Sequence, residues 1–182
     1  MKKKVLAFGA SNSKNSINKK FASFAGRSLE NVELRVVDLN DFELPLYSID
    51  LERETGVHDN AIHFFNAIKQ SDAVIISLAE YNGLHTSAFK NLWDWMSRID
   101  NMNIWSKKPM FLLSTSPSKR PGSNVIKVSQ QLFPYFGANI IASYHLPSFN
   151  HFFSEDGILD EEQRSAFEKE KIKFQEHLNN LN

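Results

Sequence analysis

The chain has 182 residues, of which 42% are hydrophobic and 23% charged, and it carries 21 basic and 21 acidic side chains. This length fits one domain, and the globular composition excludes the disordered, collagen-like and membrane-spanning classes. The balanced charge provides no positive field for nucleic acid or an anionic membrane, and the lack of cysteine excludes disulfides, thiolate metal sites and cysteine nucleophiles.

The first residues are a basic stretch followed by a short apolar run that ends at Gly9. A signal peptide needs an apolar run of ~7 to 15 residues, and a membrane span needs ~20. No run in the chain reaches those lengths. We therefore expect a single cytoplasmic domain over residues 1–182, with neither nucleic-acid nor membrane partners.

Five short apolar runs predict β-strands, and the amphipathic segments that alternate with them predict α-helices. In chain order these are strand 5–8, helix 16–28, strand 33–38, helix 57–70, strand 73–77, helix 87–99, strand 110–114, helix 123–136, strand 139–143 and helix 160–178. Strands buried on both faces need such near-continuous apolar runs. The alternation predicts an α/β fold, a parallel sheet with helices on both faces. Periodicity leaves the strand order open.

The loop after the first strand runs from Gly9 to Asn18 and is rich in hydroxyl and amide groups. It leads into a helix, whose unpaired N–H groups and positive dipole end can hold an anion such as a phosphate monoester. The glycine spacing fits neither the P-loop nor the dinucleotide fingerprint. The alternative is that Ser13 or Ser16 only caps the helix while the other polar residues face water.

The loop after the third strand reads Ala-Glu-Tyr-Asn-Gly over residues 79–83. Asn-Gly is a turn signal, and the preceding tyrosine is a large aromatic residue in a loop expected to be exposed. Its ring could pack against a flat heteroaromatic ligand. The alternative is an ordinary turn with Tyr81 folded back onto the core. If the strand order is flavodoxin-like, 2-1-3-4-5, both loops lie at one ligand site beyond the first and third strands.

Together the two motifs resemble those of the NADPH-dependent FMN reductase family, a branch of the flavodoxin-like superfamily. Residues 10–18 follow its first loop, Gly-Ser-x-Arg/Ser-x-x-Ser-x-Asn, with Ala10 in the glycine place. Residues 79–83 and 89–95 follow its Pro-Glu-Tyr-Asn-Gly and Leu-Lys-Asn-x-x-Asp-Trp segments. The resemblance implies a flavodoxin-like three-layer sandwich, with a five-stranded parallel sheet in the order 2-1-3-4-5.

The resemblance also implies an FMN-dependent NAD(P)H oxidoreductase. Bound FMN would take hydride from NADPH or NADH, a transient co-substrate, and pass electrons to a small acceptor: flavin, quinone, azo compound or metal ion. The flavin carries this chemistry, so no catalytic side chain and no protein-bound metal are expected. A homodimer or homotetramer is implied as well. The residues implied to bind FMN are Ser11, Ser13, Ser16, Ile17 and Asn18 in the first loop, Ala79, Glu80, Tyr81, Asn82 and Gly83 in the second, and Ser114 and Ser116 in a third loop after the fourth strand.

In that third loop, Ser118 and Pro121 stand where the family commonly has glycine. Lys119 and Arg120 could stabilise an anionic reduced flavin, or could simply face solvent.

Two aromatic side chains near the second loop need separate interpretation. His85 could donate a proton to a quinone, but a lone loop histidine is more often exposed to solvent, and we expect exposure. Trp95 lies off the helical face shared by residues 89, 92, 93 and 96, which predicts an exposed apolar contact between subunits.

Two other function classes stay open from the sequence. One is an FMN-binding electron-transfer or redox-sensing protein without significant NAD(P)H oxidation. The other is a protein that binds a different phosphorylated ligand and no flavin. An electron carrier would be expected to have an acidic docking face, of which the balanced charge gives no sign, so the sequence favours the enzyme.

Overall fold

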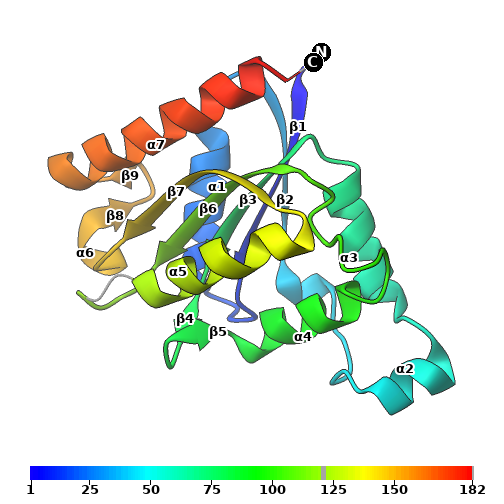
Figure 1. The fold of residues 1–182 in the computed structure, drawn as a ribbon. Helices are drawn as coiled ribbons and strands as arrows, with labels where there is room; N and C mark the ends of the chain where they lie inside the picture. The colour runs from blue at the N-terminus through cyan, green and yellow to red at the C-terminus, as the bar shows by residue number, and fades with distance from the viewer. Residues whose placement is uncertain (120–121, 182) are drawn as a thin grey trace.

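Five parallel strands form the central sheet: β1 (Lys3–Ala10), β2 (Val32–Val37), β3 (Ala73–Leu78), β6 (Pro109–Thr115) and β7 (Asn139–Leu146). They are described here from a computed structural model, which covers residues 1–119 and 122–181. Their order in the sheet is β2-β1-β3-β6-β7 (Figure 1). Counted along the chain, this is the predicted order 2-1-3-4-5, which is confirmed.

Helices cover both faces of the sheet and complete three layers (Figure 1). On one face lie α1 (Ile17–Arg27) and α7 (Glu161–Asn179), and on the other α3 (Asp59–Lys69), α4 (Ser87–Met96) and α5 (Ser123–Leu132). Successive strand residues point to opposite faces, so the sheet separates two hydrophobic cores. In β1, Val5 and Ala7 belong to the core under α1 and α7, whereas Leu6 and Phe8 belong to the core under the other three helices.

The shortest elements were not predicted as separate elements, because helices of three to seven residues and strands of two residues are too short to show a period. They are η1 (Leu39–Asp41), α2 (Ile49–Thr55), β4 (Glu80–Tyr81), β5 (Leu84–His85), η2 (Phe133–Phe136), α6 (Phe149–Phe152), β8 (Phe153–Ser154) and β9 (Gly157–Ile158). The predicted helix 123–136 is divided into α5 and η2, since Pro134 lacks the N–H that would continue the α-helix. The last strand of the sheet continues to Leu146, beyond the predicted end.

Trp95 is fully buried, so the predicted exposed contact is wrong. Its Nε1–H donates to the carbonyl oxygen of Pro45 at 2.9 Å, and its ring meets the Tyr47 ring edge-on at 5.2 Å. The chain after β2 therefore covers the outer side of α4. The spacing of residues within a helix cannot show that a segment from elsewhere in the sequence packs over its outer face.

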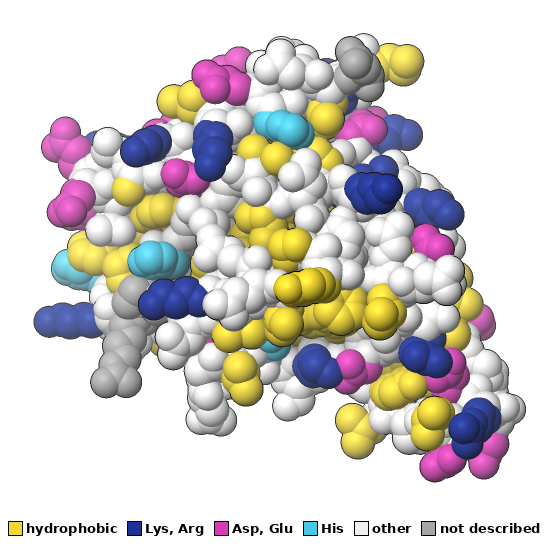
Figure 2. All heavy atoms as spheres, viewed as in Figure 1, with side chains coloured by type: hydrophobic (Ala, Val, Ile, Leu, Met, Phe, Trp, Pro, Cys, Tyr) yellow, Lys and Arg dark blue, Asp and Glu magenta, His cyan; other side chains and the backbone are white. Residues whose placement is uncertain are grey.

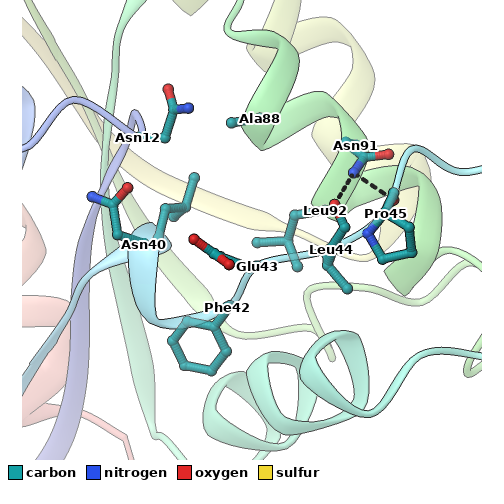
Figure 3. Close-up of a pocket in the computed structure, with 10 residues that line it drawn as sticks. Asn12, Asn40, Phe42, Glu43, Leu44, Pro45, Ala88, Asn91 and Leu92 are labelled. Atoms are coloured by element: carbon teal, nitrogen blue, oxygen red, sulfur yellow. Dashed lines mark hydrogen bonds between the residues drawn. The ribbon is translucent and has the colours of Figure 1, made fainter.

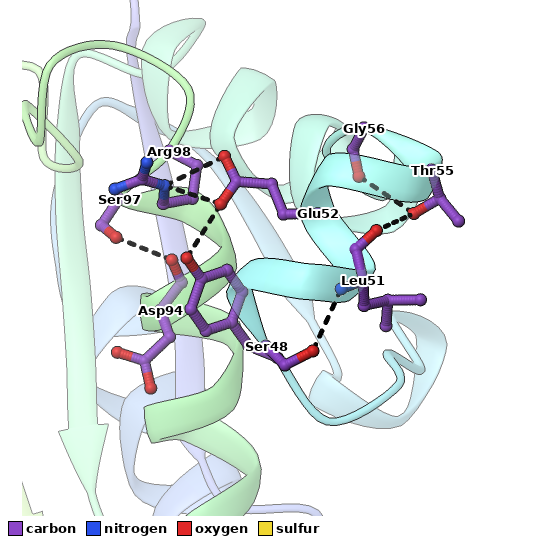
Figure 4. A network of polar contacts seen from close by, with 9 residues as sticks. Ser48, Leu51, Glu52, Thr55, Gly56, Asp94, Ser97 and Arg98 are labelled. Carbon is purple, nitrogen blue, oxygen red and sulfur yellow. Dashed lines mark hydrogen bonds and ion pairs between the residues drawn. The ribbon is translucent and has the colours of Figure 1, made fainter.

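Polar contacts fix this covering segment to α4 (Figure 4). The Glu52 carboxylate in α2 accepts hydrogen bonds from the Tyr47 hydroxyl at 2.8 Å and from Nε of Arg98 at 3.0 and 3.1 Å. These two donors lower the pKa of Glu52. The Tyr47 N–H also donates to Oδ1 of Asn91 at 2.8 Å. The segment that leads into α2 is thus held in a defined place beside α4.

Among the described residues, no helix has both the length and the apolar character needed to cross a bilayer.

Candidate functional site

Three loops meet at the carboxyl ends of β1, β3 and β6. Parallel pairing places Ala10 opposite Leu78, and Leu78 opposite Ser114. The loops 11–16, 79–86 and 116–122 therefore begin side by side at one edge of the sheet (Figure 1). The two sequence motifs lie on adjacent strands, as the hypothesis of a shared ligand site requires.

Asn18 joins the first loop to the two neighbouring strands. Its Oδ1 accepts hydrogen bonds from the Ser77 hydroxyl at 2.7 Å and from the Thr115 N–H at 3.0 Å. Its Nδ2 donates to the Thr115 carbonyl oxygen at 3.2 Å. The Asn18 side chain is buried. The side chain thus links the first loop to the strands that lead into the other two. Only the backbone N–H of Asn18 is left to bind a ligand.

Thr86 joins the first loop to the second. Its hydroxyl donates to the carbonyl oxygen of Ala10 at 3.0 Å and accepts from the N–H of Phe89 at 3.2 Å, so it also caps α4. Sequence reasoning missed this connection. The available signal was a threonine directly before a predicted helix, which is a preferred capping position.

Gly9 allows α1 to start close against β1. A Cβ atom at this position would lie 2.3 Å from the backbone nitrogen of Lys19 and 2.7 Å from the backbone carbon of Asn18. Both neighbours are backbone atoms and cannot rotate away. Only glycine permits this approach, which places the first turn of α1 next to the end of the strand.

The first loop offers hydrogen-bond donors to an anion. Ser16 caps α1 through its hydroxyl, which accepts from the Lys19 N–H at 3.1 Å, and Ser11 accepts from the Ser13 N–H at 3.2 Å. The N–H groups of Ile17 and Asn18 in the first turn have no acceptor among the described residues. The cap that formed the alternative interpretation is therefore present, and it leaves two helix donors for a phosphate.

An ion pair lies beside this loop. The Lys19 ammonium bonds to the Asp38 carboxylate at the end of β2, and Asn40 donates to the same carboxylate. Burial alone would raise the pKa of Asp38, but the hydrogen bonds from Lys19 and Asn40 outweigh it and hold that pKa below its usual value. This pair fixes α1 to β2 and neutralises a carboxylate that would otherwise repel an anion.

The second loop forms a hairpin from β4 and β5. Asn82 and Gly83 have φ angles of 53° and 83°, which is the geometry of a two-residue hairpin turn. The Tyr81 side chain is 54% exposed, so the alternative in which it folds onto the core is wrong. Ala79 is buried at the base of the loop. The hairpin projects an aromatic side chain at the edge where the loops meet.

The Glu80 carboxylate points toward α5. It accepts the Val125 N–H at 2.9 Å in the first turn of that helix, whose capping residue, Gly122, has no side chain to do so. Glu80 therefore supplies the missing helix cap from a separate loop. Its carboxylate therefore holds the hairpin against α5 and is not available to a ligand, whereas its backbone can still border one.

The end of β6, which leads into the third loop, carries a buried hydroxyl without a partner among the described residues. Ser114 is fully buried, and its Oγ has no hydrogen-bond partner within residues 1–119 and 122–181. A Cβ atom at Gly122 would lie 2.3 Å from this oxygen, so the backbone of Gly122 lies directly against it. Ser116 lies nearer the surface, with its Oγ 3.0 Å from that of Ser118. Lys119 is exposed, whereas Arg120 and Pro121 lie outside the described residues.

A cavity of about 530 Å³ opens beside the first loop (Figure 3). Its walls are Asn12, residues 39–45 after β2, and the first turns of α4. The Glu43 carboxylate lies within it, among the leucine side chains of both walls (Figure 3). Cavities of this size hold small-molecule ligands. This cavity could not be predicted from the sequence, because residues 39–45 are largely irregular and have no period.

His85 is not exposed as predicted but partly buried under aromatic side chains. Burial, and then the charge of Lys90, lower its pKa to about 4, so the ring is neutral at pH 7. Within the described part of the chain, no group of three or more His, Asp or Glu side chains could hold a metal ion.

Known proteins resemble this chain in sequence and in fold. The family model described as NADPH-dependent FMN reductase matches residues 3–151, a range that includes all three loops. A quinone reductase of Pseudomonas putida is 34% identical over 105 residues, which are 57% of this chain and 55% of that protein. The match thus spans about half the length of that relative. An uncharacterized protein of Mycoplasma pneumoniae is 30% identical over 151 residues, 77% of this chain and 84% of its own.

Among solved structures, the flavoenzyme FerB of Paracoccus denitrificans, an NAD(P)H:(acceptor) oxidoreductase, superposes with a TM-score of 0.74. The superposition covers 97% of each chain at 22% sequence identity. At this identity the likeness concerns the fold, and it confirms the predicted flavodoxin-like sandwich.

Proposed function

The chain belongs to the NADPH-dependent FMN reductase family, and from this premise we propose that its single domain binds FMN and acts as an NAD(P)H oxidoreductase toward a small acceptor. The observation that carries the proposal is the junction of the three loops. It combines helix N–H groups that have no acceptor in the described part of the chain with an exposed tyrosine, at the edge where parallel α/β sheets bind their ligands.

The first loop would hold the phosphate of FMN. The N–H groups of Ile17 and Asn18 would donate to it, helped by the positive end of α1 and by the exposed hydroxyl of Ser13. The buried oxygens of Ser11 and Ser16 hold the loop in the shape that presents these donors.

The second and third loops would surround the ring system. Tyr81 offers a flat apolar face, Ala79, Asn82 and Gly83 offer backbone groups, and Ser116 offers a hydroxyl near the surface. The buried Ser114 oxygen, which lacks a partner among the described residues, lies against Gly122 at the base of the third loop. When bound, FMN supplies the hydride-accepting ring, and the protein supplies binding, orientation and electrostatics.

NADPH or NADH would bind transiently and then give way to the acceptor, which would be a flavin, quinone, azo compound or metal ion. No dinucleotide fingerprint is present in the sequence that would hold a nicotinamide nucleotide permanently. The cavity between the first loop, residues 39–45 and α4 offers room for a second small molecule at the same edge.

We also propose that the protein is a cytoplasmic homodimer or homotetramer. Hydrophobic side chains gather on the face that α4 and α5 share (Figure 2). Among the exposed large hydrophobic residues, Leu46 and Tyr135 are each 83% accessible, which suits a contact with another copy of the chain. Light scattering after size exclusion would give the mass, and a monomer would contradict this part of the proposal.

The activity is tested by spectroscopy of the purified protein. FMN is added, its binding is followed by the quenching of its fluorescence, and the complex is mixed without oxygen with NADPH or NADH. Bleaching of the visible flavin band, followed by reoxidation with members of an acceptor panel, would support the oxidoreductase. Bound FMN that neither nucleotide bleaches would indicate the electron-transfer or redox-sensing alternative. Absence of FMN binding would overturn the proposal.

A further inference from the structure

The hairpin formed by β4 and β5 is too small to hold its own position. Each strand has two residues, and isolated hairpins of this size are not stable in water. Its orientation must therefore come from contacts with the rest of the protein. Glu80 and His85 stand directly opposite each other in the hairpin, so their side chains leave it on the same side.

Both residues bind α5, Glu80 at the N-terminal end of the helix and His85 at a side chain one turn further on. The Val125 N–H donates to Oε2 of Glu80 at 2.9 Å, and Nε2 of His85 lies 2.7 Å from the Ser129 hydroxyl oxygen in a hydrogen bond. Val125 and Ser129 are four residues apart and so lie on one side of the helix, one turn from each other. The hairpin is attached to α5 at two points, which fixes both its position and its tilt.

The His85 contact lies in an apolar environment. The ring is stacked on Phe133 at 5.9 Å, meets Trp93 edge-on at 5.4 Å and lies 5.6 Å from Phe89. Ser129 is fully buried. The charge of Lys90 in α4 acts on the ring, and Glu80 stands opposite His85 in the hairpin. Little water competes for a hydrogen bond between neutral groups in such surroundings, which favours one geometry.

The second cross-strand pair points the other way. Side chains alternate along a strand, so Tyr81 and Leu84 leave the hairpin on the side opposite to Glu80 and His85. They are 54% and 56% exposed and form an apolar surface at the edge where the three loops meet. The direction of this surface depends on how the other pair is attached.

We propose that His85 is a positioning residue that, together with Glu80, clamps the hairpin to α5 and so sets the place of Tyr81 and Leu84 against the bound flavin. The inference rests on the proposed function for its flavin part only. The clamp itself consists of contacts within the protein, so it can be measured in the ligand-free protein.

The first test uses the ligand-free protein and hydrogen exchange of the peptide that spans residues 80–86. His85→Phe keeps a flat ring but removes the hydrogen bond, His85→Gln keeps a polar group, and Ser129→Ala removes the partner hydroxyl. We expect exchange about tenfold faster in His85→Phe and Ser129→Ala, and near the wild-type rate in His85→Gln. The double variant His85→Phe/Ser129→Ala should be no faster than His85→Phe alone, because both changes break one bond.

The matched control is Ser71→Ala. This serine is also buried, and its hydroxyl donates to the carbonyl oxygen of Ile68 at 2.7 Å. It lies just before β3, at the end of the strands opposite to the three loops. It should leave the exchange of residues 80–86 unchanged. Wild-type exchange in both His85→Phe and Ser129→Ala, or equal acceleration in Ser71→Ala, would overturn the clamp.

The second test adds FMN and measures its affinity by fluorescence and the visible circular dichroism of the bound flavin. His85→Phe and Ser129→Ala should bind FMN about tenfold more weakly with an altered dichroism, whereas Ser71→Ala should match wild type. Wild-type affinity and dichroism in His85→Phe would overturn the positioning role. If the wild-type protein itself did not bind FMN, the proposed function would fail, while the exchange experiment would still decide the clamp.

Discussion

Ser16 lies at the N-terminal end of α1, where its side-chain oxygen is close to several backbone N–H groups. The hydroxyl accepts the Lys19 N–H, and this leaves the N–H groups of Ile17 and Asn18 to an anion. A capping residue and an anion site can therefore coexist at one helix end, provided the cap brings no negative charge.

The change Ser16→Asp separates the two roles. Aspartate caps helices as well as serine does, so α1 should remain folded, but the added carboxylate would repel the FMN phosphate. We expect FMN affinity to fall at least about a hundredfold, as judged from titration by fluorescence. Ser48→Asp makes the same exchange at the cap of α2, where Ser48 accepts the Leu51 N–H, and should bind FMN normally. Equal affinity in both variants would place the phosphate elsewhere.

The buried His85 ring predicts a specific loss of stability in acid. The pKa of His85 is about 4 in the folded protein against an ordinary value of 6.5, so between these values the unfolded chain binds a proton that the folded protein does not. The free energy of unfolding should therefore fall as the pH is lowered from 6.5 to 4. With allowance for the part of the ring that solvent reaches, this contribution is about 2 kcal/mol.

Carboxylates also titrate in this range, so the comparison is with His85→Phe. Urea unfolding at pH 7 and at pH 4.5 should show a larger drop in wild type than in the variant. Identical drops would mean that His85 is as accessible to protons in the folded protein as in the unfolded chain.

Asn18 has its effect at the level of elements, since it links α1 to β3 and β6. Asn18→Ala would remove three hydrogen bonds and leave Ser77 and Thr115 with unpaired buried groups. We expect a loss of about 3 kcal/mol in the free energy of unfolding, measured with urea, and weaker FMN binding. Asn40→Ala, which removes one exposed hydrogen bond to Asp38, should cost much less. Similar losses in the two variants would contradict the linking role.

The long elements could be predicted from the sequence because their patterns are local. The apolar runs of β1, β3 and β6 reflect burial on both faces, and α1, α3 and α7 begin and end within two residues of their predicted positions. The directions in which the site side chains point could not be predicted from the sequence. Glu80 and His85 find their partners in α5 at sequence separations of 45 and 44 residues, and no spacing within a motif records such contacts.

At the scale of the whole molecule, ligand binding should stabilise the folded protein. FMN at a hundred times its dissociation constant should add about 2.7 kcal/mol to the free energy of unfolding, which corresponds to a rise of roughly 5 to 10 °C in the melting temperature. Riboflavin has the same ring but no phosphate, so at equal concentration it should give less than about half this shift. Thermal unfolding followed by circular dichroism measures both. Equal shifts would argue against a phosphate site in the first loop.

The charges of the molecule are consistent with small-molecule substrates. On the face shown in Figure 2, basic and acidic side chains are interspersed, and neither sign dominates. Such a surface gives little long-range steering to a large charged partner.

The hydrogen bonds of Asn18 and Thr86 have a practical meaning for protein engineering. Since each of these side chains satisfies backbone atoms at the end of a neighbouring strand, grafting one loop from a relative would leave unmatched donors and acceptors beside the two loops that stay. Attempts to change which ligands the protein accepts should therefore transplant the three segments as one cassette, with Ser77 and Thr115 included.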